Sequence, residues 1–332
     1  MKTVKKVRLA DVAARAGVSC GAAGKVLNGG SNSIRVGEAA RQRILEAADA
    51  LGYSQNMAAS ILAGGKSKLI GVIIDSASSY RYQRLLYEIE RVAASLGYRI
   101  LTSFTHDNIA TLRDNYRTMQ GYGMAGFICC AHDYPDLKDE MREFIDQSEN
   151  VVFMEKPIGQ NVPYVATDRT NALSAMIADA LSKGYKRIGL RHGSLIWQTE
   201  QTLYDEFQRA MVLNGLDFAT ALVIEDPPGN LPLAERVTWF IENYILREHP
   251  DFLYVDDAYY AAVLQHQLHE CGLNITLCGG DANPLFHGLG INSFDPCYEK
   301  IARALVELLV QEKRDTEPVV IEAVYRNGTV KE

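Results

Sequence analysis

The sequence lacks the features that would place it in a membrane, outside the cell or at a metal centre. No apolar run approaches the roughly 20 residues needed to cross a bilayer, and Met1 to Lys6 carry three lysines instead of the apolar stretch of a signal peptide. The six cysteines show no metal-type pair spaced two residues apart. We therefore expect a cytoplasmic protein with reduced thiols, no membrane partner and no bound metal.

The charges that are present are unevenly distributed along a chain of ordinary globular composition. The 332 residues are 47% hydrophobic and 23% charged, which is enough for more than one core. Residues 1–68 hold eleven Lys or Arg against four acidic residues, a balance of +7, so the net charge of -7 leaves -14 for the remainder. A small basic module on an acidic body is typical of a chain that meets phosphate at one end.

The basic module is predicted to contain three short helices. The first covers residues 8–16, and Gly17 marks its C-terminal end. Ser19 is placed as the N-cap of a second helix that runs to about Asn28, so the pair forms a helix-turn-helix in which the second helix reads the groove. A third helix over residues 38–51 completes a small shared core.

Four short motifs in this module occur at fixed spacing. They are Asp11-Val-Ala-x-x-Ala-Gly-Val-Ser19, Lys25-Val-Leu-Asn28, Arg43-Ile-Leu and Leu51-Gly-Tyr53, and the pattern continues through Asn56, Ala59, Leu62, Ser67 and Ile70-Gly-Val72. This series resembles the headpiece, hinge and first sensor strand of the lactose-repressor/galactose-repressor (LacI/GalR) family. The resemblance implies a DNA-binding headpiece over 1–53, a hinge helix and linker over 54–68, and an effector-binding and dimerisation domain over 69–332.

The resemblance also implies which residues contact DNA. In the headpiece and hinge these are Arg8, Ser19, Cys20, Gly21, Ala22, Ala23, Lys25, Asn28, Tyr53, Asn56, Ala59 and Leu62. In the family the leucine that matches Leu62 wedges into a central base step of the minor groove. The expected partner is a palindromic double-stranded operator, bound by a homodimer.

The reading helix departs from the family pattern. The family usually has Thr-Val-Ser-Arg before Val-Leu-Asn, whereas this chain has Ala22-Ala23-Gly24-Lys25. Lys25 lacks the bidentate fork of an arginine, and Ala22 or Ala23 could pack on a thymine methyl. Gly21 and Gly24 each cost roughly 1 kcal/mol of helix stability relative to alanine. The operator sequence of relatives therefore does not transfer to this chain.

Beyond residue 69, apolar strand-like runs alternate with helical patterns. Expected strands cover 70–74, 98–104, 127–130, 151–154, 187–190, 221–224, 252–255 and 276–278, and expected helices cover 82–96, 109–121, 137–147, 171–183, 200–213, 233–247 and 258–270. This rhythm predicts an α/β sensor of two lobes, each a parallel sheet covered by helices. It resembles the periplasmic-binding-protein-like fold, with lobe one over about 69–167 and 296–324 and lobe two over about 168–295 and 325–332.

The resemblance implies a small-molecule effector, a sugar or sugar derivative, in the cleft between the lobes. The implied effector-binding residues are Arg81, Tyr82, Trp197, Thr199, Leu203, Asp257, Asp281 and Asp295. Asp257 matches the family's aspartate, whose carboxylate accepts hydrogen bonds from hydroxyl groups. Leu203 stands where many relatives carry an arginine, so an anionic ligand group would lose its partner. Trp197 offers an aromatic face to a ligand, or else packs between the lobes.

Two apparent cofactor or metal signals carry no prediction. Gly121-x-Gly123-x-x-Gly126 precedes a strand instead of joining a strand to a helix, so no dinucleotide site is expected. His266 and His269 have no further metal ligand at suitable spacing. The sequence also lacks a G-x-S-x-G nucleophile elbow. We expect no cofactor and no enzymatic activity.

These observations predict a ligand-responsive, sequence-specific transcription regulator, a repressor of a carbohydrate-utilisation operon. The alternative is a cytoplasmic solute- or sugar-binding protein on the same sensor fold that retains only non-specific affinity for DNA. An enzyme on this fold is a weaker alternative, because a catalytic constellation is missing from the sequence.

Overall fold

The computed structural model describes residues 7–28, 34–54, 67–75, 80–159, 161–225, 231–311 and 317–325. The chain divides into two compact units, one made of Met1–Leu69 with Thr118–Ala125 and the other of Ile70–Arg117 with Gly126–Glu332. In the described ranges, no helix combines the length and the apolar character that a membrane span requires.

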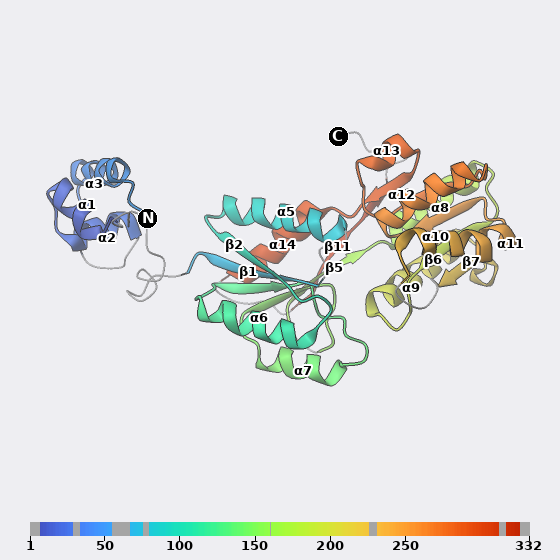
Figure 1. Cartoon of the computed structure of the whole chain (residues 1–332), viewed down its shortest axis with the longest axis horizontal. Helices are drawn as coiled ribbons and strands as arrows, with labels where there is room; N and C mark the ends of the chain where they lie inside the picture. Colours follow the sequence, from blue (N-terminus) through green and yellow to red (C-terminus); the bar gives the residue numbers. More distant parts are fainter. Residues whose placement is uncertain are drawn as a thin grey trace. The chain divides into compact units, whose positions relative to one another are not determined.

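The first unit contains the three expected headpiece helices, labelled in Figure 1: α1 (Leu9–Ala16), α2 (Cys20–Asn28) and α3 (Glu38–Leu51). Gly17 and Gly52 end α1 and α3 in the left-handed conformation, with φ of 64° and 61°, where a side chain would be strained. The buried core of this unit consists of Val12, Ala13, Ala16, Ala23, Ile44, Ala47 and Ala48. Small alanines let the three helices approach closely.

In the second unit, one six-stranded sheet has the order β11-β5-β4-β3-β1-β2. Its strands are β1 (Leu69–Ile74), β2 (Arg99–Phe104), β3 (Gly126–Cys129), β4 (Val151–Met154), β5 (Tyr164–Asp168) and β11 (Val319–Glu322). The pairs β1–β3, β3–β4, β4–β5 and β5–β11 are parallel. Helices α5 (Tyr80–Ser95) and α14 (Tyr298–Val310) cover one face, and α6 (Ile109–Gly121) and α7 (Lys138–Gln147) cover the other (Figure 1).

The second sheet of this unit has the order β12-β10-β9-β8-β6-β7. Its strands are β6 (Ile188–His192), β7 (Leu222–Glu225), β8 (Phe252–Val255), β9 (Thr276–Gly279), β10 (Asn292–Asp295) and β12 (Val324–Tyr325), of which only the β10–β12 pair is antiparallel. Helices α8 (Thr170–Ser182) and α9 (Gln198–Leu213) pack in the core on one face, and α10 (Leu233–Phe240), α12 (Ala258–Glu270) and α13 (Leu285–Leu289) pack in the core on the other.

The predicted fold class is confirmed, because both sheets are dominated by parallel pairs and both are covered by helices. One expected element differs. The helix predicted over 233–247 is α10 followed by a π-helical turn at Ile241–Ile245 and a last short turn at Leu246–Glu248. The apolar spacing of this segment is that of an ordinary α-helix, so the sequence does not reveal the wider turn.

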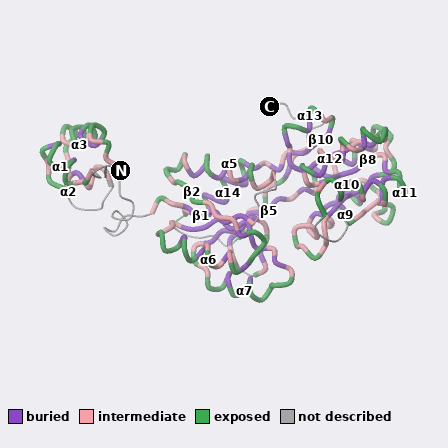
Figure 2. The backbone as a smooth tube through the Cα atoms, in the orientation of Figure 1, coloured by how far each residue is buried: buried purple, intermediate pink, exposed green. Residues whose placement is uncertain are grey.

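The sheets position the residues that could bind a ligand. Buried strands run through the centre of each lobe, while the outer faces of the covering helices are exposed (Figure 2). Carboxyl ends of parallel strands meet at one edge of a sheet, and ligands of open α/β sheets bind outside that edge. The chain also passes between the lobes here, and the Ala323 N–H donates to the Asp168 carbonyl at 2.9 Å.

Candidate functional site

The second headpiece helix, α2, begins as the sequence predicts. The Ser19 hydroxyl oxygen accepts a hydrogen bond from the Ala22 N–H at 3.2 Å, which satisfies one of the free donors in the first turn. The two glycines of α2 have packing reasons. A Cβ at Gly21 would lie 2.9 Å from the Ile34 side chain, and one at Gly24 would lie 3.3 Å from that of Leu9.

One predicted DNA contact in α2 needs correction. Ala23 is completely buried in the headpiece core, so its methyl group is not available to a base. Cys20 is exposed, and Ala22 and Lys25 are half-buried. The accessible part of the reading helix therefore offers a thiol, a methyl group and one ammonium group. The error arose because helical spacing alone does not show which face of α2 turns inward.

The remaining headpiece residues lie at the ends of helices or beyond the described chain. Arg8 is exposed at the start of α1, where its backbone N–H donates to the Asp11 carboxylate at 2.8 Å. Tyr53 packs half-buried against the headpiece core. Asn28 ends α2, and its side chain lies outside what the structure describes. The predicted hinge contacts also lie outside the described residues: Asn56, Ala59 and Leu62.

In the second unit, Arg81 connects the two lobes. It projects from α5, in the lobe of the first sheet, and its guanidinium pairs with the Asp256 carboxylate just beyond β8 in the other lobe. The Arg81 Nε also lies 3.6 Å from Asp281, just beyond β9. Tyr254 donates to Asp256 at 2.6 Å and Tyr298 donates to Asp281 at 2.7 Å. Each of the two carboxylates thus accepts a hydrogen bond from a tyrosine hydroxyl.

The two aspartates titrate in opposite directions. Burial disfavours the charged form of Asp256, but Arg81 and Arg169 outweigh it and lower the pKa of Asp256 to about 2. For Asp281, burial prevails over Arg81 and raises the pKa to about 6. Asp256 is therefore the principal counter-ion of the Arg81 guanidinium.

Two predicted effector residues have structural partners within their own lobe. Leu203 is 2% exposed and packs in the core between α9 and its sheet, because a leucine at this position joins the apolar face of the helix. The Asp257 carboxylate caps α12 by accepting from the Tyr260 N–H at 2.8 Å. Its neighbour Asp256 is the one that pairs with Arg81. Asp295 accepts from the Cys297 N–H at 2.8 Å and is half-buried.

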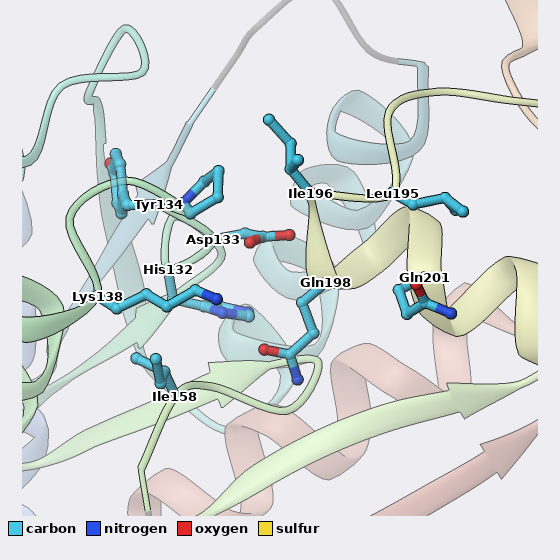
Figure 3. Close-up of a pocket in the computed structure, with 10 residues that line it drawn as sticks. His132, Asp133, Tyr134, Lys138, Ile158, Leu195, Ile196, Gln198 and Gln201 are labelled. Carbon is cyan, nitrogen blue, oxygen red and sulfur yellow. The ribbon is translucent and has the colours of Figure 1, made fainter. Parts of the chain in front are cut away.

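Three cavities of about 300, 200 and 100 Å³ share His132 in their walls. Arg81, Tyr82, Trp197 and Thr199 line the one of about 100 Å³, so four of the predicted effector residues meet around one space. Figure 3 shows the 300 Å³ cavity, with His132, Asp133 and Lys138 on one side and Gln198 and Ile196 on the other. Both lobes contribute walls to these cavities.

His132 is a buried hydrogen-bond acceptor at the junction of the cavities. Its side chain is 5% exposed, and its Nε2–H donates to the Met154 carbonyl oxygen. Burial lowers the pKa of His132, which keeps the ring neutral and leaves Nδ1 as an acceptor. Among the described residues, Nδ1 has no hydrogen-bond partner.

Glu155 brings a second acceptor to the same place. It follows β4 with φ of 65°, a left-handed conformation that is uncommon for a side-chain-bearing residue and is often found at functional sites. Oε2 accepts from the Thr167 N–H at 3.3 Å, while the buried Oε1 has no hydrogen-bond donor within the described chain. Arg169 lies 3.9 Å from Oε1 and donates to Glu206 at 3.0 Å.

Asp133 forms a second connection between the lobes. Its carboxylate accepts from the N–H and the hydroxyl of Thr199, at 3.1 and 3.3 Å. Thr199 lies in the first turn of α9, where the helix dipole stabilises a nearby carboxylate. Asp133 and Arg81 therefore both join the lobes, and both line the 100 Å³ cavity together with Trp197.

Five residues of this cleft were not predicted from the sequence. They are His132, Asp133, Glu155, Arg169 and Asp256. His132, Asp133, Glu155 and Asp256 each stand within three residues of the end of a predicted strand, at the edge where parallel sheets bind ligands. Arg169 follows β5, a strand that was not predicted. Polar residues directly after predicted strands were therefore the signal that was available in the sequence.

The chain is similar in sequence to known regulators, although no family model matches it. It is 28% identical over 199 residues to the sucrose operon repressor of Klebsiella pneumoniae, which covers 59% of this chain and just over half of that protein, 56%. It is 26% identical over 272 residues to catabolite control protein A of Priestia megaterium, which covers 81% of this chain and 79% of that protein.

The fold is shared with solved repressor structures. The Lac repressor dimer bound to operator and the anti-inducer ONPF superposes with a TM-score of 0.76 at 18% identity, over 96% of this chain and 97% of that one. A LacI-family regulator from Silicibacter pomeroyi gives 0.69 at 24% identity, over 96% and 98%. The CelR regulator in complex with cellobiose gives 0.63 at 16% identity, over 97% and 98%. The chain is thus similar in sequence to two regulators and shares the fold of LacI-family structures.

Proposed function

We propose that this protein is a ligand-responsive, sequence-specific transcription regulator that binds a palindromic operator as a homodimer and represses a carbohydrate-utilisation operon. One observation carries the proposal: a helix-turn-helix headpiece with an exposed reading face stands on the same chain as a two-lobed unit with a polar cleft. The relatives support it, since one is named a sucrose operon repressor and a structural neighbour was solved bound to operator.

The headpiece supplies the DNA-binding half of this function. Residues 1–53 act as the headpiece and 54–68 as hinge and linker, with Leu62 as the minor-groove wedge. Cys20, Ala22 and Lys25 are the α2 side chains that reach base edges in the major groove. Exposed basic residues around them, such as Arg8, position the protein on the phosphates.

The second unit supplies the ligand-responsive half of this function. It regulates and does not catalyse a reaction, and the protein acts in the cytoplasm. The ligand binds among Arg81, Tyr82, Trp197 and Thr199, beside Asp256 and Asp281. Arg81 pairs across the lobes, so a ligand that competes for Asp256 or adds a new contact changes the lobe closure. By linkage, the ligand and the operator then change each other's affinity by the same factor.

Selection of random duplex DNA by the purified full-length protein, at near-physiological salt and with sequencing of the bound pool, tests this proposal. An enriched palindrome is the expected result. Binding that fades with salt and enriches no sequence would instead support a solute- or sugar-binding protein with only non-specific DNA affinity.

A further inference from the structure

We propose that the effector of this cleft is a small cation, an amine or guanidine that also carries hydrogen-bond donors. The inference rests on the proposed function in one respect, namely that the cleft between the lobes is the ligand site. It goes further by assigning the charge of the ligand. Two independent features of the cleft carry it: an excess of negative charge and two buried acceptors without a donor.

The negative charge of the cleft exceeds what its own cations neutralise. Among the described residues, Glu206 is paired with Arg169, and Arg191 offsets Glu200. The same cleft holds five further carboxylates and one further guanidinium, that of Arg81, although Arg169 also lies 3.9 Å from Glu155 and acts on Asp256. The five are Asp75, Asp133, Glu155, Asp256 and Asp281. This leaves a formal excess of four negative charges in buried or half-buried positions, which a bound cation would reduce.

Two acceptor atoms in the walls of the same cavities have no hydrogen-bond donor within the described chain. Nδ1 of His132, on a side chain that is 5% exposed, has no hydrogen-bond partner within the described chain, and neither has the buried Oε1 of Glu155. His132 and Glu155 both line the cavities of about 200 and 100 Å³. A ligand with N–H groups satisfies both atoms, and leaving such atoms unsatisfied is costly.

An anionic ligand fits this cleft poorly. Arg81, the cation in the wall of the 100 Å³ cavity, is already held by Asp256, and Leu203 supplies no charge because it is a core residue. Arg169 lines the 200 Å³ cavity, but its guanidinium is already held by Glu206 at 3.0 Å. Lys138 and Lys156 line only the two larger cavities and are exposed, so their ammonium groups stay solvated. A neutral polyol would satisfy the acceptors but leave the charge excess as it is.

The test compares matched probes that differ only in charge. Thermal unfolding and calorimetric titration of the full-length protein at pH 7 would use glucosamine against glucose and glucuronate, and putrescine against butane-1,4-diol. We expect at least one amine to raise the melting temperature at millimolar concentration while its neutral and acidic counterparts do not. The shift should decrease with added salt.

An isosteric variant locates the binding. Glu155→Gln removes the charge but keeps an oxygen for the Thr167 N–H, and should weaken the amine about 10-fold or more, as expected for a charge-assisted hydrogen bond. Glu143→Gln makes the same chemical change on the exposed face of α7, with a side chain that is 56% exposed, and should leave the amine affinity unchanged. The comparison of probes on the wild-type protein stands even if Glu155→Gln does not fold.

Two results would overturn the inference: equal or tighter binding of a neutral or acidic counterpart, or no melting shift with either amine. DNA selection on the same protein separates this failure from failure of the proposed function. An enriched palindrome that is released by a neutral sugar would retain the regulator and reject the cationic ligand. Charge-dependent amine binding without sequence enrichment would retain the cationic ligand and reject the regulator.

Discussion

At the scale of single residues, the cleft is governed by carboxylates whose neighbours set opposite proton affinities. Asp256 stays charged to about pH 2 because two guanidinium groups outweigh its burial, whereas burial of Asp281 raises its pKa to about 6. A carboxyl group with a raised pKa binds its proton more tightly in the folded state than in the unfolded state. Its contribution to stability is therefore full below about pH 4 and is lost as the pH rises through 6.

The first prediction follows from this loss of stability as the pH rises through the pKa of Asp281. Asp281→Asn keeps an oxygen for the Tyr298 hydroxyl and cannot ionise. The free energy of unfolding of the variant, relative to wild type, should rise by up to about 3 kcal/mol between pH 4 and pH 7. Urea unfolding across that range measures the difference. A difference that stays constant with pH would contradict the raised pKa.

The second prediction concerns the reading helix. Lys25 is the one cation that α2 contains, as its sequence shows. Lys25→Ala should reduce discrimination at one base pair of each half-site by about 1 to 3 kcal/mol. Arg8→Ala, at the exposed start of α1, serves as the phosphate-contact control and should weaken all duplexes alike. Competition binding on single-base variants of the selected duplex measures both, and an equal loss across all variants for Lys25→Ala would refute its role in base recognition.

At the scale of secondary-structure elements, helix starts and packing faces determine what the reading surface offers. The N-cap of α2 could be predicted from Ser19, because a hydroxyl before a helix accepts a hydrogen bond from an N–H of the first turn. The burial of Ala23 could not be predicted from the sequence, because it depends on how α1 and α3 pack around α2. Likewise, Gly21 and Gly24 look destabilising in isolation, and their reason lies in Ile34 and Leu9.

The third prediction tests this cap. Ser19→Ala should destabilise the headpiece by about 1 kcal/mol, because the Ala22 N–H loses its partner. Amide hydrogen exchange in α2 should quicken about fivefold, which corresponds to that energy. Ser182→Ala, at the exposed end of α8, is the matched control and should leave exchange in α2 unchanged. Unchanged protection in Ser19→Ala would show that the hydroxyl does not cap the helix.

Eight strands and seven helices of the second unit were predicted, because alternating apolar runs indicate burial in a parallel sheet. The strands β5 and β10 and the helices α13 and α14 were not predicted. The cleft chemistry was only partly predictable. Asp256 and Asp257 are neighbours in sequence, and the choice between capping α12 and pairing with Arg81 depends on where β8 ends. Trp197 and Thr199 were found through the resemblance, whereas His132 and Glu155 required the sheets to be assembled.

At the scale of the whole molecule, an ion pair and hydrogen bonds to a carboxylate connect the two lobes of the second unit. Arg81 crosses to Asp256, and Asp133 crosses to Thr199. A ligand that makes equivalent contacts can replace them, and closure of the cleft then responds to ligand binding. The same contacts also contribute to the stability of the unit.

The fourth prediction tests the Arg81–Asp256 ion pair, which is the bridge between the lobes. Arg81→Met leaves Asp256 and Asp281 without their shared guanidinium and should lower the free energy of unfolding by about 3 to 5 kcal/mol. Adding Asp256→Asn should recover part of this loss, since the uncompensated charge is removed. Arg303→Met, with an arginine that is 51% exposed on α14, should change stability by less than about 1 kcal/mol. Equal effects at Arg81 and Arg303 would argue against the bridge.

The most direct test of the central claim is the affinity of the full-length protein for its selected palindrome and for a shuffled duplex of the same composition, at one near-physiological salt concentration. A regulator that reads sequence through α2 should bind the palindrome about 10³-fold or more tightly than the shuffled duplex. Equal affinities that decrease in parallel as salt rises would contradict sequence-specific regulation.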